Sequence, residues 1–152
     1  AWSIRGNALG NLGRSEEAIS SYERALAINP DVPNIWSNLG ASFNNLGRYE
    51  KAIDCARRAK WLNPDHSHAW YVEGFALIFL DRFEEAIASY DRAMAINPND
   101  ANAWTNRGYA LVKLGRYEEA IASCDRALAL NPDSDYAWTN RGYALRKLGR
   151  FE

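Results

Sequence analysis

The sequence predicts an all-α protein, a solenoid built from stacked helix pairs, and three observations support this fold class. First, the 152-residue chain repeats itself every 34 residues, in its Asn-Pro pairs and in its tryptophans, and such a period is typical of stacked copies of one small unit. Second, apolar residues recur within each copy at offsets that share one helix face. Third, glycine and proline recur where helices would end. The pairs are Asn29-Pro30, Asn63-Pro64, Asn97-Pro98 and Asn131-Pro132, and the tryptophans are Trp2, Trp36, Trp70, Trp104 and Trp138.

The first helix of each copy carries a stripe of predicted core residues. Glycine follows the tryptophan after four residues, and leucine or phenylalanine follows it after seven, so all three lie on one face. A glycine within a helix costs about 1 kcal/mol relative to alanine. We therefore predict close helix-to-helix approach, with no room for a methyl group, at Gly6, Gly40, Gly74, Gly108 and Gly142.

The first helix is predicted to end at a Leu-Gly pair, with the glycine as a left-handed cap. The third copy has Leu80-Asp81 at this place, and aspartate is among the residues that tolerate the left-handed conformation. The four Leu-Gly pairs are Leu12-Gly13, Leu46-Gly47, Leu114-Gly115 and Leu148-Gly149.

The second helix follows this turn and ends at Asn-Pro, because proline disfavours helical geometry in the residue before it. Alanine occupies two fixed positions of this helix. Between them the copies alternate, since Tyr22 and Tyr90 are large whereas Ala56 and Cys124 are small. Each unit is therefore predicted to consist of a helix, a tight turn, a second helix and a short loop.

The recurrent pattern Trp-x-x-x-Gly, then Leu, Ala, Tyr, Ala and Pro, resembles the tetratricopeptide repeat, and the resemblance covers the whole chain. It implies antiparallel helix pairs wound into a right-handed superhelix, here of about four and a half repeats. It also implies that each first helix lines a concave groove and that the protein is a scaffold for peptides or partner proteins.

We expect one array of five copies. Residues 1–32 form the first repeat with a truncated start, and residues 33–66, 67–100 and 101–134 form three full repeats. Residues 135–152 form the first helix of a fifth, truncated repeat. The chain begins and ends inside a repeat, which favours a piece of a longer array.

The face of the first helices opposite the core stripe is nearly uncharged. Only Lys113 and Lys147 carry a full charge there, whereas a solvated helix face is usually rich in charged residues. Amides and aromatic rings without charge suit a surface that becomes dry on binding. The alternative is that neighbouring first helices pack sideways and partly bury these rings. The candidate peptide-binding residues are Asn7, Asn38, Asn45, His68, Tyr71, Phe75, Phe79, Asn106, Tyr109, Lys113, Asn140, Tyr143 and Lys147.

Three of these amides, Asn38, Asn106 and Asn140, each lie two residues after a tryptophan. A carboxamide can donate to and accept from a peptide backbone without a charge to desolvate. The arrangement resembles the asparagine ladder in the repeats of O-linked N-acetylglucosamine transferase, although Ile4 and Val72 interrupt it here. The predicted groove is amide-rich at its start, apolar in its middle and basic at its end, which favours a ligand with an apolar anchor and an acidic segment.

Other functions lack support in the sequence. The net charge of −1 gives no field that would attract nucleic acid or an anionic membrane, and no apolar run approaches the roughly 20 residues of a membrane span. His66 and His68 are interpreted as exposed loop residues and not as metal ligands. No cofactor motif or catalytic group is found, so we predict a protein that is not an enzyme. Glu73 is expected to pair with Arg107 of the next copy.

Two alternatives to a peptide-binding scaffold remain open. One is self-association, head to tail, through apolar repeat ends such as the helix that contains Trp138. The other is a substrate-recruiting segment of a larger enzyme such as a glycosyltransferase. Two free thiols, Cys55 and Cys124, favour a reducing compartment. We therefore expect a cytoplasmic location and assign none to a longer parent protein.

Overall fold

The computed structural model describes residues 1–150, and in this part of the chain it contains nine α-helices and no strand. Phe151 and Glu152, the last two residues of the expected fifth repeat, lie outside the described residues. The helices are α1 (Trp2–Asn11), α2 (Ser15–Ile28), α3 (Pro33–Asn45), α4 (Tyr49–Leu62), α5 (Ser67–Phe79), α6 (Phe83–Ile96), α7 (Ala101–Lys113), α8 (Tyr117–Leu130) and α9 (Asp135–Lys147).

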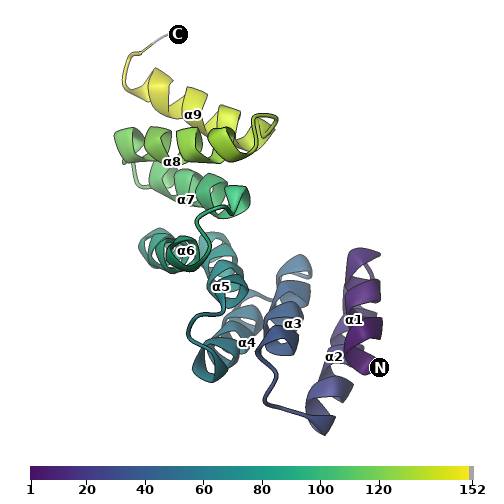
Figure 1. Ribbon diagram of the computed structural model, residues 1–152. Helices are drawn as coiled ribbons and strands as arrows, with labels where there is room; N and C mark the ends of the chain where they lie inside the picture. The colour runs from purple at the N-terminus through teal and green to yellow at the C-terminus, as the bar shows by residue number, and fades with distance from the viewer. Residues whose placement is uncertain (151–152) are drawn as a thin grey trace.

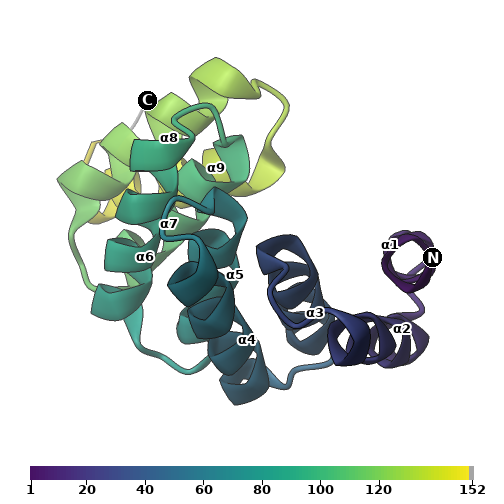
Figure 2. The ribbon, with the colours of Figure 1, turned by 60° about the horizontal axis from the view of Figure 1, so that its bottom comes forward.

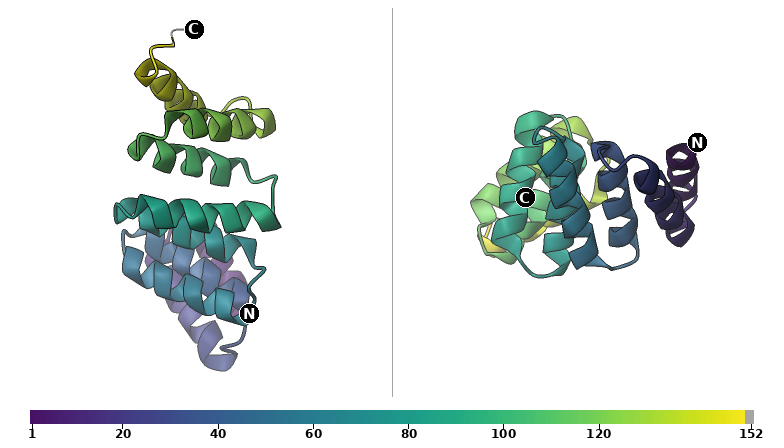
Figure 3. Two further views of the ribbon diagram at one scale, coloured as in Figure 1. Left: turned by 90° about the vertical axis from the view of Figure 1, so that its left-hand side faces the viewer. Right: turned by 90° about the horizontal axis from the view of Figure 1, so that it is seen from below.

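The helices form an all-α superhelix in which each helix packs on its neighbours in the sequence. Figure 3 shows the layers following one another from the N-terminus at one end to the C-terminus at the other. From α1 to α6, the odd-numbered helices lie on the inner side of the bend, and α2, α4 and α6 lie on its outer side (Figure 1). The first helices α1, α3 and α5 therefore lie on the inner side of the bend, as the family resemblance implied.

We propose that the repeats divide at residues 33, 67, 101 and 135, because α3, α5, α7 and α9 begin there. The predicted left-handed caps are confirmed. The glycines after the first helices have φ between 69° and 74°, and Asp81, which replaces glycine in the third copy, has φ of 56°. These residues reverse the chain within a tight turn, so each second helix can lie against its own first helix.

The constant spacing of tryptophan and proline has a reason that the sequence analysis missed. The indole Nε1 of Trp36 donates a hydrogen bond of 2.7 Å to the carbonyl oxygen of Pro30. The same bond recurs in the next three copies, at 2.8, 2.9 and 2.8 Å. Each of these four tryptophans thus ties its helix to the loop before it. Their rings lie at the edge of the core and not within it, and that of Trp138 is 52% exposed.

The predicted close approach at the glycines of the first helices is confirmed for four of the five. A Cβ built on Gly40 would lie 2.9 Å from Val72 Cγ1 and 3.1 Å from the carbonyl oxygen of Ala52. Gly6, Gly74 and Gly108 similarly face side chains of their own second helices at 3.0 Å or less. The prediction is wrong for Gly142, because nothing lies within 4 Å of that position on α9.

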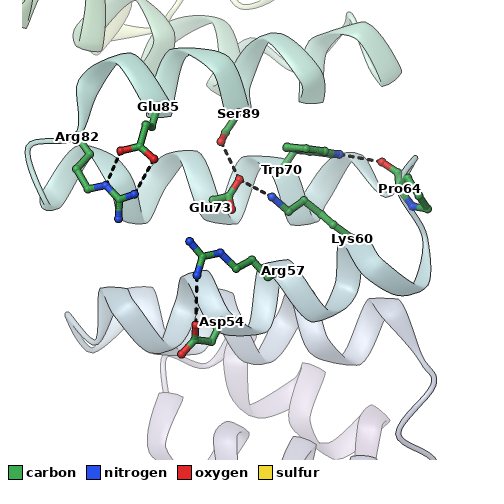
Figure 4. Close-up of polar contacts among 9 residues, drawn as sticks. All are labelled: Asp54, Arg57, Lys60, Pro64, Trp70, Glu73, Arg82, Glu85 and Ser89. Carbon is green, nitrogen blue, oxygen red and sulfur yellow. Dashed lines mark hydrogen bonds and ion pairs between the residues drawn. The ribbon is translucent and has the colours of Figure 1, made fainter.

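The expected pair between Glu73 and Arg107 does not form. Instead, Lys60 Nζ on α4 donates to Glu73 Oε2 on α5 at 2.6 Å, and Ser89 Oγ on α6 donates to the same oxygen at 2.8 Å (Figure 4). Arg107 pairs with Asp91 at 2.7 Å. Each charged group therefore finds its partner on the preceding second helix, because that helix lies between two successive first helices.

Candidate functional site

On the inner surface of the described part, residues 1–150, two hollows together gather most of the candidate residues. The first, which we call the amide hollow, has a volume of about 380 Å³ and lies between α1 and α3. None of its lining residues carries a charge. They are Asn7, Gly10, Asn11, Tyr22, Asn38, Ala41, Ser42 and Asn45.

A small hydrogen-bond network forms the wall of the amide hollow. The hydroxyl of Tyr22, on α2, donates to Asn7 Oδ1 at 2.8 Å, and Asn38 Nδ2 donates to the same oxygen at 3.1 Å. Burial raises the pKa of Tyr22, so the phenol remains protonated at neutral pH. Asn38 keeps its carbonyl oxygen and a second N–H, which leaves it able to bind a peptide backbone.

The second hollow, which we call the aromatic hollow, has a volume of about 470 Å³ and spans α5, α7 and α9. Aromatic and aliphatic side chains dominate its surface, with amides and hydroxyls at intervals and one acidic residue, the exposed Asp81. The lining residues are Phe75, Ile78, Phe79, Asp81, Thr105, Asn106, Tyr109, Tyr136, Thr139 and Asn140.

Aromatic contacts hold the rings of this hollow in place. Phe79 stacks on Tyr49 of α4, with the ring centroids 4.8 Å apart, and Phe75 lies 5.0 Å from Phe79. Phe75 and Tyr109 are half-buried, so sideways packing and an accessible surface occur together at the same rings. Phe79 remains 52% exposed and Tyr136 80% exposed, so both offer free aromatic surface.

Five candidate residues do not line either hollow. His68 stacks on Tyr71 at 6.2 Å, and the hydroxyl of Tyr71 accepts a hydrogen bond from Asn106 Nδ2 at 3.1 Å. His68 and Tyr71 therefore lie beside the aromatic hollow without lining it. The remaining three, Lys113, Tyr143 and Lys147, are exposed at the ends of α7 and α9.

The cations at this end of the groove lie over aromatic rings. Lys113 Nζ is 5.3 Å from the ring centroid of Tyr109, which itself lines the aromatic hollow. Lys147 Nζ and the guanidinium of Arg146 lie 5.5 and 5.2 Å from the ring of Tyr143. None of these three cations has an ion pair within residues 1–150. Positive charge therefore borders the aromatic hollow and is absent from the amide hollow.

Val72, which the sequence placed on the groove face, belongs to the interior, and so does Asn44 of the preceding copy. Val72 is only 1% exposed, because α5 packs closely on α3 at Gly40. Asn44 is also buried, and its Nδ2 donates to the backbone carbonyl of Val72 at 2.9 Å. Conversely, the sequence analysis missed Thr105 and Thr139, which directly follow tryptophans and line the aromatic hollow. The equivalent residue of the third copy is Tyr71, which was recognised as a candidate, so the repeat register pointed to both threonines.

A third hollow, of about 410 Å³, involves the outer helices α2 and α4 together with α3. Its lining includes the charged side chains of Glu23, Lys51 and Asp54. This composition differs from that of the two inner hollows and matches the charged second helices. The inner hollows, with Asp81 as their one charged lining residue, are thus less charged than this outer hollow.

The two histidines lie at the start of α5 and not in a free loop as expected. His66 is the N-cap residue of α5, and its Nε2 lies 2.8 Å from Ser37 Oγ on α3. Desolvation lowers the pKa of His66 below its ordinary value. Desolvation, followed by the neighbouring His66, also lowers the pKa of His68, against the opposing effect of Asp100. Both rings are therefore more often neutral in the folded protein than in the unfolded chain.

We expect the folded protein to lose stability as the pH falls below about 6.5, the ordinary pKa of histidine. The unfolded chain protonates His66 and His68 first, because folding depresses both pKa values, and proton binding then favours unfolding. The salt-bridged carboxylates Glu17, Glu85 and Glu119 also have lowered pKa values but act only below about 4.5.

Urea unfolding at pH 7.5 and 5.5 measures this loss. The same measurement on a His66→Asn/His68→Gln variant should give a smaller difference between the two pH values. An equal loss of stability in the variant would contradict the assignment of the effect to these rings.

Within residues 1–150, no group of three or more His, Cys, Asp or Glu side chains is arranged to hold a metal ion. No helix in the described part of the chain has the length and apolar character that a membrane span requires. The thiols of Cys55 and Cys124 are buried, and this burial raises the pKa of Cys55 to about 12 and that of Cys124 to about 11.

Comparison with known families gives a consistent result along the chain. The profile described as tetratricopeptide repeat matches residues 33–66 and 101–134, and a second profile with that description matches residues 123–152. A profile described as TPR repeat matches residues 6–47 and 74–115, which is more than half of the chain. No curated protein sequence matches the chain.

Solved structures of other proteins share the fold. MamA has a TM-score of 0.84 at 24% identity, over 97% of this chain and 81% of its own. TTC0263, a thermophilic TPR protein in Thermus thermophilus, has a TM-score of 0.83 at 26% identity, over 98% of this chain and 82% of its own. YrrB, described as a TPR protein with an unusual peptide-binding site, has a TM-score of 0.79 at 22% identity, over 99% of this chain and 78% of its own. On these matches, the chain belongs to the tetratricopeptide repeat family.

Proposed function

We propose that this protein is a scaffold that binds a peptide or a segment of a partner protein along its inner surface, and that it acts by binding and not by catalysis. The observation that carries the proposal is the contrast between its two surfaces. The first helices present amides and aromatic rings around two hollows, whereas the second helices present charged residues. A nearly uncharged, partly aromatic depression costs little free energy to desolvate when a ligand covers it.

The solved structure of YrrB supports the proposal by analogy, because its description names a peptide-binding site on the same fold. The candidate contacts in this chain are its own. Phe79 supplies exposed aromatic surface, and Asn38 and Asn140 supply amides that reach solvent. One net hydrogen bond contributes only about 0.5–1.5 kcal/mol, so aromatic contacts have to add to the amides.

Selection of binders from a library of random 16-residue peptides displayed on phage tests the proposal. We expect peptides to be enriched on the intact chain and to lose about tenfold in affinity when Phe79 or Asn140 is changed to alanine, as is usual for one lost anchor. Affinities are measured by fluorescence anisotropy on synthetic copies of the enriched peptides.

The matched control is Trp61→Ala. Trp61 is 70% exposed on the second helix α4, so this variant also removes an exposed aromatic ring but leaves the inner surface unchanged. Its affinity for the same peptides should equal that of the unmodified chain. Failure to enrich any peptide, or equal loss in the control, would contradict the proposal.

Self-association is a second candidate, favoured by the exposure of α9. Tyr136 is 80% exposed and Trp138 52% exposed on this helix, and Ile4 is 72% exposed on α1. Burial of one large apolar side chain contributes about 1.5–3 kcal/mol, so several such contacts could join two copies. Light scattering between low and high protein concentration decides the point, because an unchanging monomer mass would reject this candidate.

A further inference from the structure

The two inner hollows coincide with an alternation in the second helices. At one equivalent position, 20 residues after each tryptophan, the first and third copies carry Tyr22 and Tyr90. The second and fourth copies carry Ala56 and Cys124 at this position, which we call the spacer position. All four side chains are buried, so their difference in size has to be absorbed by the helices around them.

The tyrosines at the spacer position lie where two first helices meet. The ring of Tyr22 lies directly beneath Gly6 of α1, with Cε1 2.6 Å from the place of a Cβ. Its hydroxyl reaches Asn7 of α1, which is in turn bonded to Asn38 of α3. Tyr22 therefore stands between α1 and α3.

The third copy repeats this arrangement. The ring of Tyr90 lies 3.0 Å from the Cβ position of Gly74 on α5 and meets Tyr71 edge to face at 5.8 Å. Burial raises the pKa of Tyr90 well above its ordinary value. Its hydroxyl has no hydrogen bond within residues 1–150, although Asn106 of α7 donates to the adjacent Tyr71. Tyr90 and Tyr71 therefore stand between α5 and α7.

The first helices lie closer together at the junctions where the spacer residue is small. In the copy that carries Ala56, α5 packs so closely against α3 that a Cβ on Gly40 would lie 2.9 Å from Val72 Cγ1, and Asn44 bonds to the α5 backbone. Beside Cys124, α9 packs closely on α7, with Ala110 and Ala144 fully buried. By contrast, α1 and α3, and likewise α5 and α7, touch only at a few points. Figure 2 shows α1 standing away from α3 while α3 lies beside α5.

Both inner hollows open at the junctions that hold a tyrosine. The amide hollow lies at the α1–α3 junction, and the aromatic hollow lies at the α5–α7 junction and extends to α9. The closed α3–α5 junction separates them. The inner surface is thus not one uniform channel but two contact points of different chemistry, held apart by a tightly packed pair of helices.

We propose that the partner is a bipartite peptide segment that contacts both hollows at once, and that Tyr22 and Tyr90 position those hollows by separating the first helices. This proposal rests on the proposed function. An uncharged polar stretch, rich in Asn, Gln, Ser or Gly, occupies the amide hollow, because its lining offers amides and two hydroxyls and no charge. One aromatic or long aliphatic side chain occupies the aromatic hollow. Acidic residues beside that side chain complement Lys113, whose ammonium lies over Tyr109 at the edge of the hollow.

Two tryptophan substitutions fill the hollows one at a time. Ala41→Trp fills the amide hollow from α3, and Thr139→Trp fills the aromatic hollow from α9. The matched control is Ala129→Trp, which puts a tryptophan on α8 at the position where the second copy already carries the exposed Trp61. Circular dichroism and thermal unfolding establish that each variant is folded before binding is measured.

The probes are the peptides enriched from the random 16-residue library on the intact chain. We expect them to share an aromatic or long aliphatic residue at a constant separation from an uncharged polar stretch. Each filled hollow should weaken binding about tenfold or more, while Ala129→Trp leaves it unchanged. Peptides cut between their two parts should bind more weakly than the joined peptide, because joined contacts act at a high effective concentration.

The outcomes separate this inference from the proposed function. Enriched peptides that respond to only one of the two substitutions, or that lose nothing when cut in half, would overturn the bipartite partner while leaving a peptide-binding scaffold. A library that enriches no peptide on the intact chain would instead overturn the proposed function itself.

Discussion

Replacing Lys60 with methionine is expected to lower the free energy of unfolding by about 3 kcal/mol, the lower end of the cost of leaving a buried charge without its partner. The side chains of Lys60 and Glu73 are only 15% and 10% exposed, and the two atoms that pair are 2.6 Å apart. Without the ammonium, Glu73 keeps a single hydrogen bond from Ser89. Urea unfolding at neutral pH measures the loss.

The chain itself provides the rescue for this variant. At the preceding junction, the equivalent positions are occupied by Leu26 and Leu39, both buried, without any ion pair. A Lys60→Leu/Glu73→Leu double variant reproduces that junction, and replacing both members of a buried pair is often neutral or stabilising. Its stability should therefore return to within about 1 kcal/mol of the unmodified protein. If the double variant were as unstable as Lys60→Met, the ion pair itself would stabilise the fold, beyond sparing each charge the cost of being buried alone.

Changing Gly40 to alanine is expected to destabilise the protein by about 1–3 kcal/mol, the usual cost of overpacking a core. The new methyl group would meet Val72 at 2.9 Å and the backbone carbonyl of Ala52 at 3.1 Å. A backbone atom cannot rotate away as a side chain can, so α3 would have to shift from both of its neighbours. Thermal unfolding of the variant measures this cost.

Gly142 is the equivalent glycine of the last copy and provides a control of opposite sign. Nothing lies within 4 Å of its Cβ position, so alanine there brings only its higher helix propensity. This substitution should stabilise the protein by up to about 1 kcal/mol. Two equivalent substitutions would then move the melting temperature in opposite directions. The explanation by close approach would be wrong if both changed it equally.

Much of the fold could be predicted because each repeat uses local rules. The left-handed caps, four glycines and Asp81, follow from a backbone conformation that only a few residues tolerate. The ends of the second helices follow from the Asn-Pro pairs. These signals act within a few residues, so one sequence contains them in full.

The contacts between copies could be predicted less well. Glu73 was expected to pair with Arg107, but its partner is Lys60, which lies on the preceding second helix. Lys60 stands where the other copies have a leucine or a methionine. Periodicity identifies equivalent residues but gives no distances between them. For the same reason Val72 was placed on the groove face, although α5 lies so close to α3 that Val72 is buried.

The candidate site shows the same division. Asn7, Asn38 and Asn45 were predicted to share one face from their angular positions on the helices, and they line one hollow. The sequence also shows that Tyr22 is large where Ala56 is small. It could not predict that one pair of first helices stands apart and the next pair lies close, because that result depends on three helices packing together. The division of the inner surface into two hollows became visible only in the structure.

The alternation of large and small side chains also bears on the mechanics of the solenoid. Helices joined by many close contacts resist bending, whereas a junction held by one or two rings and one or two amides deforms at lower cost. We therefore expect flexing to concentrate between α1 and α3 and between α5 and α7. The intervening helices would then move as one stiff block, and the two binding points would change their separation mainly when the molecule twists about these two joints.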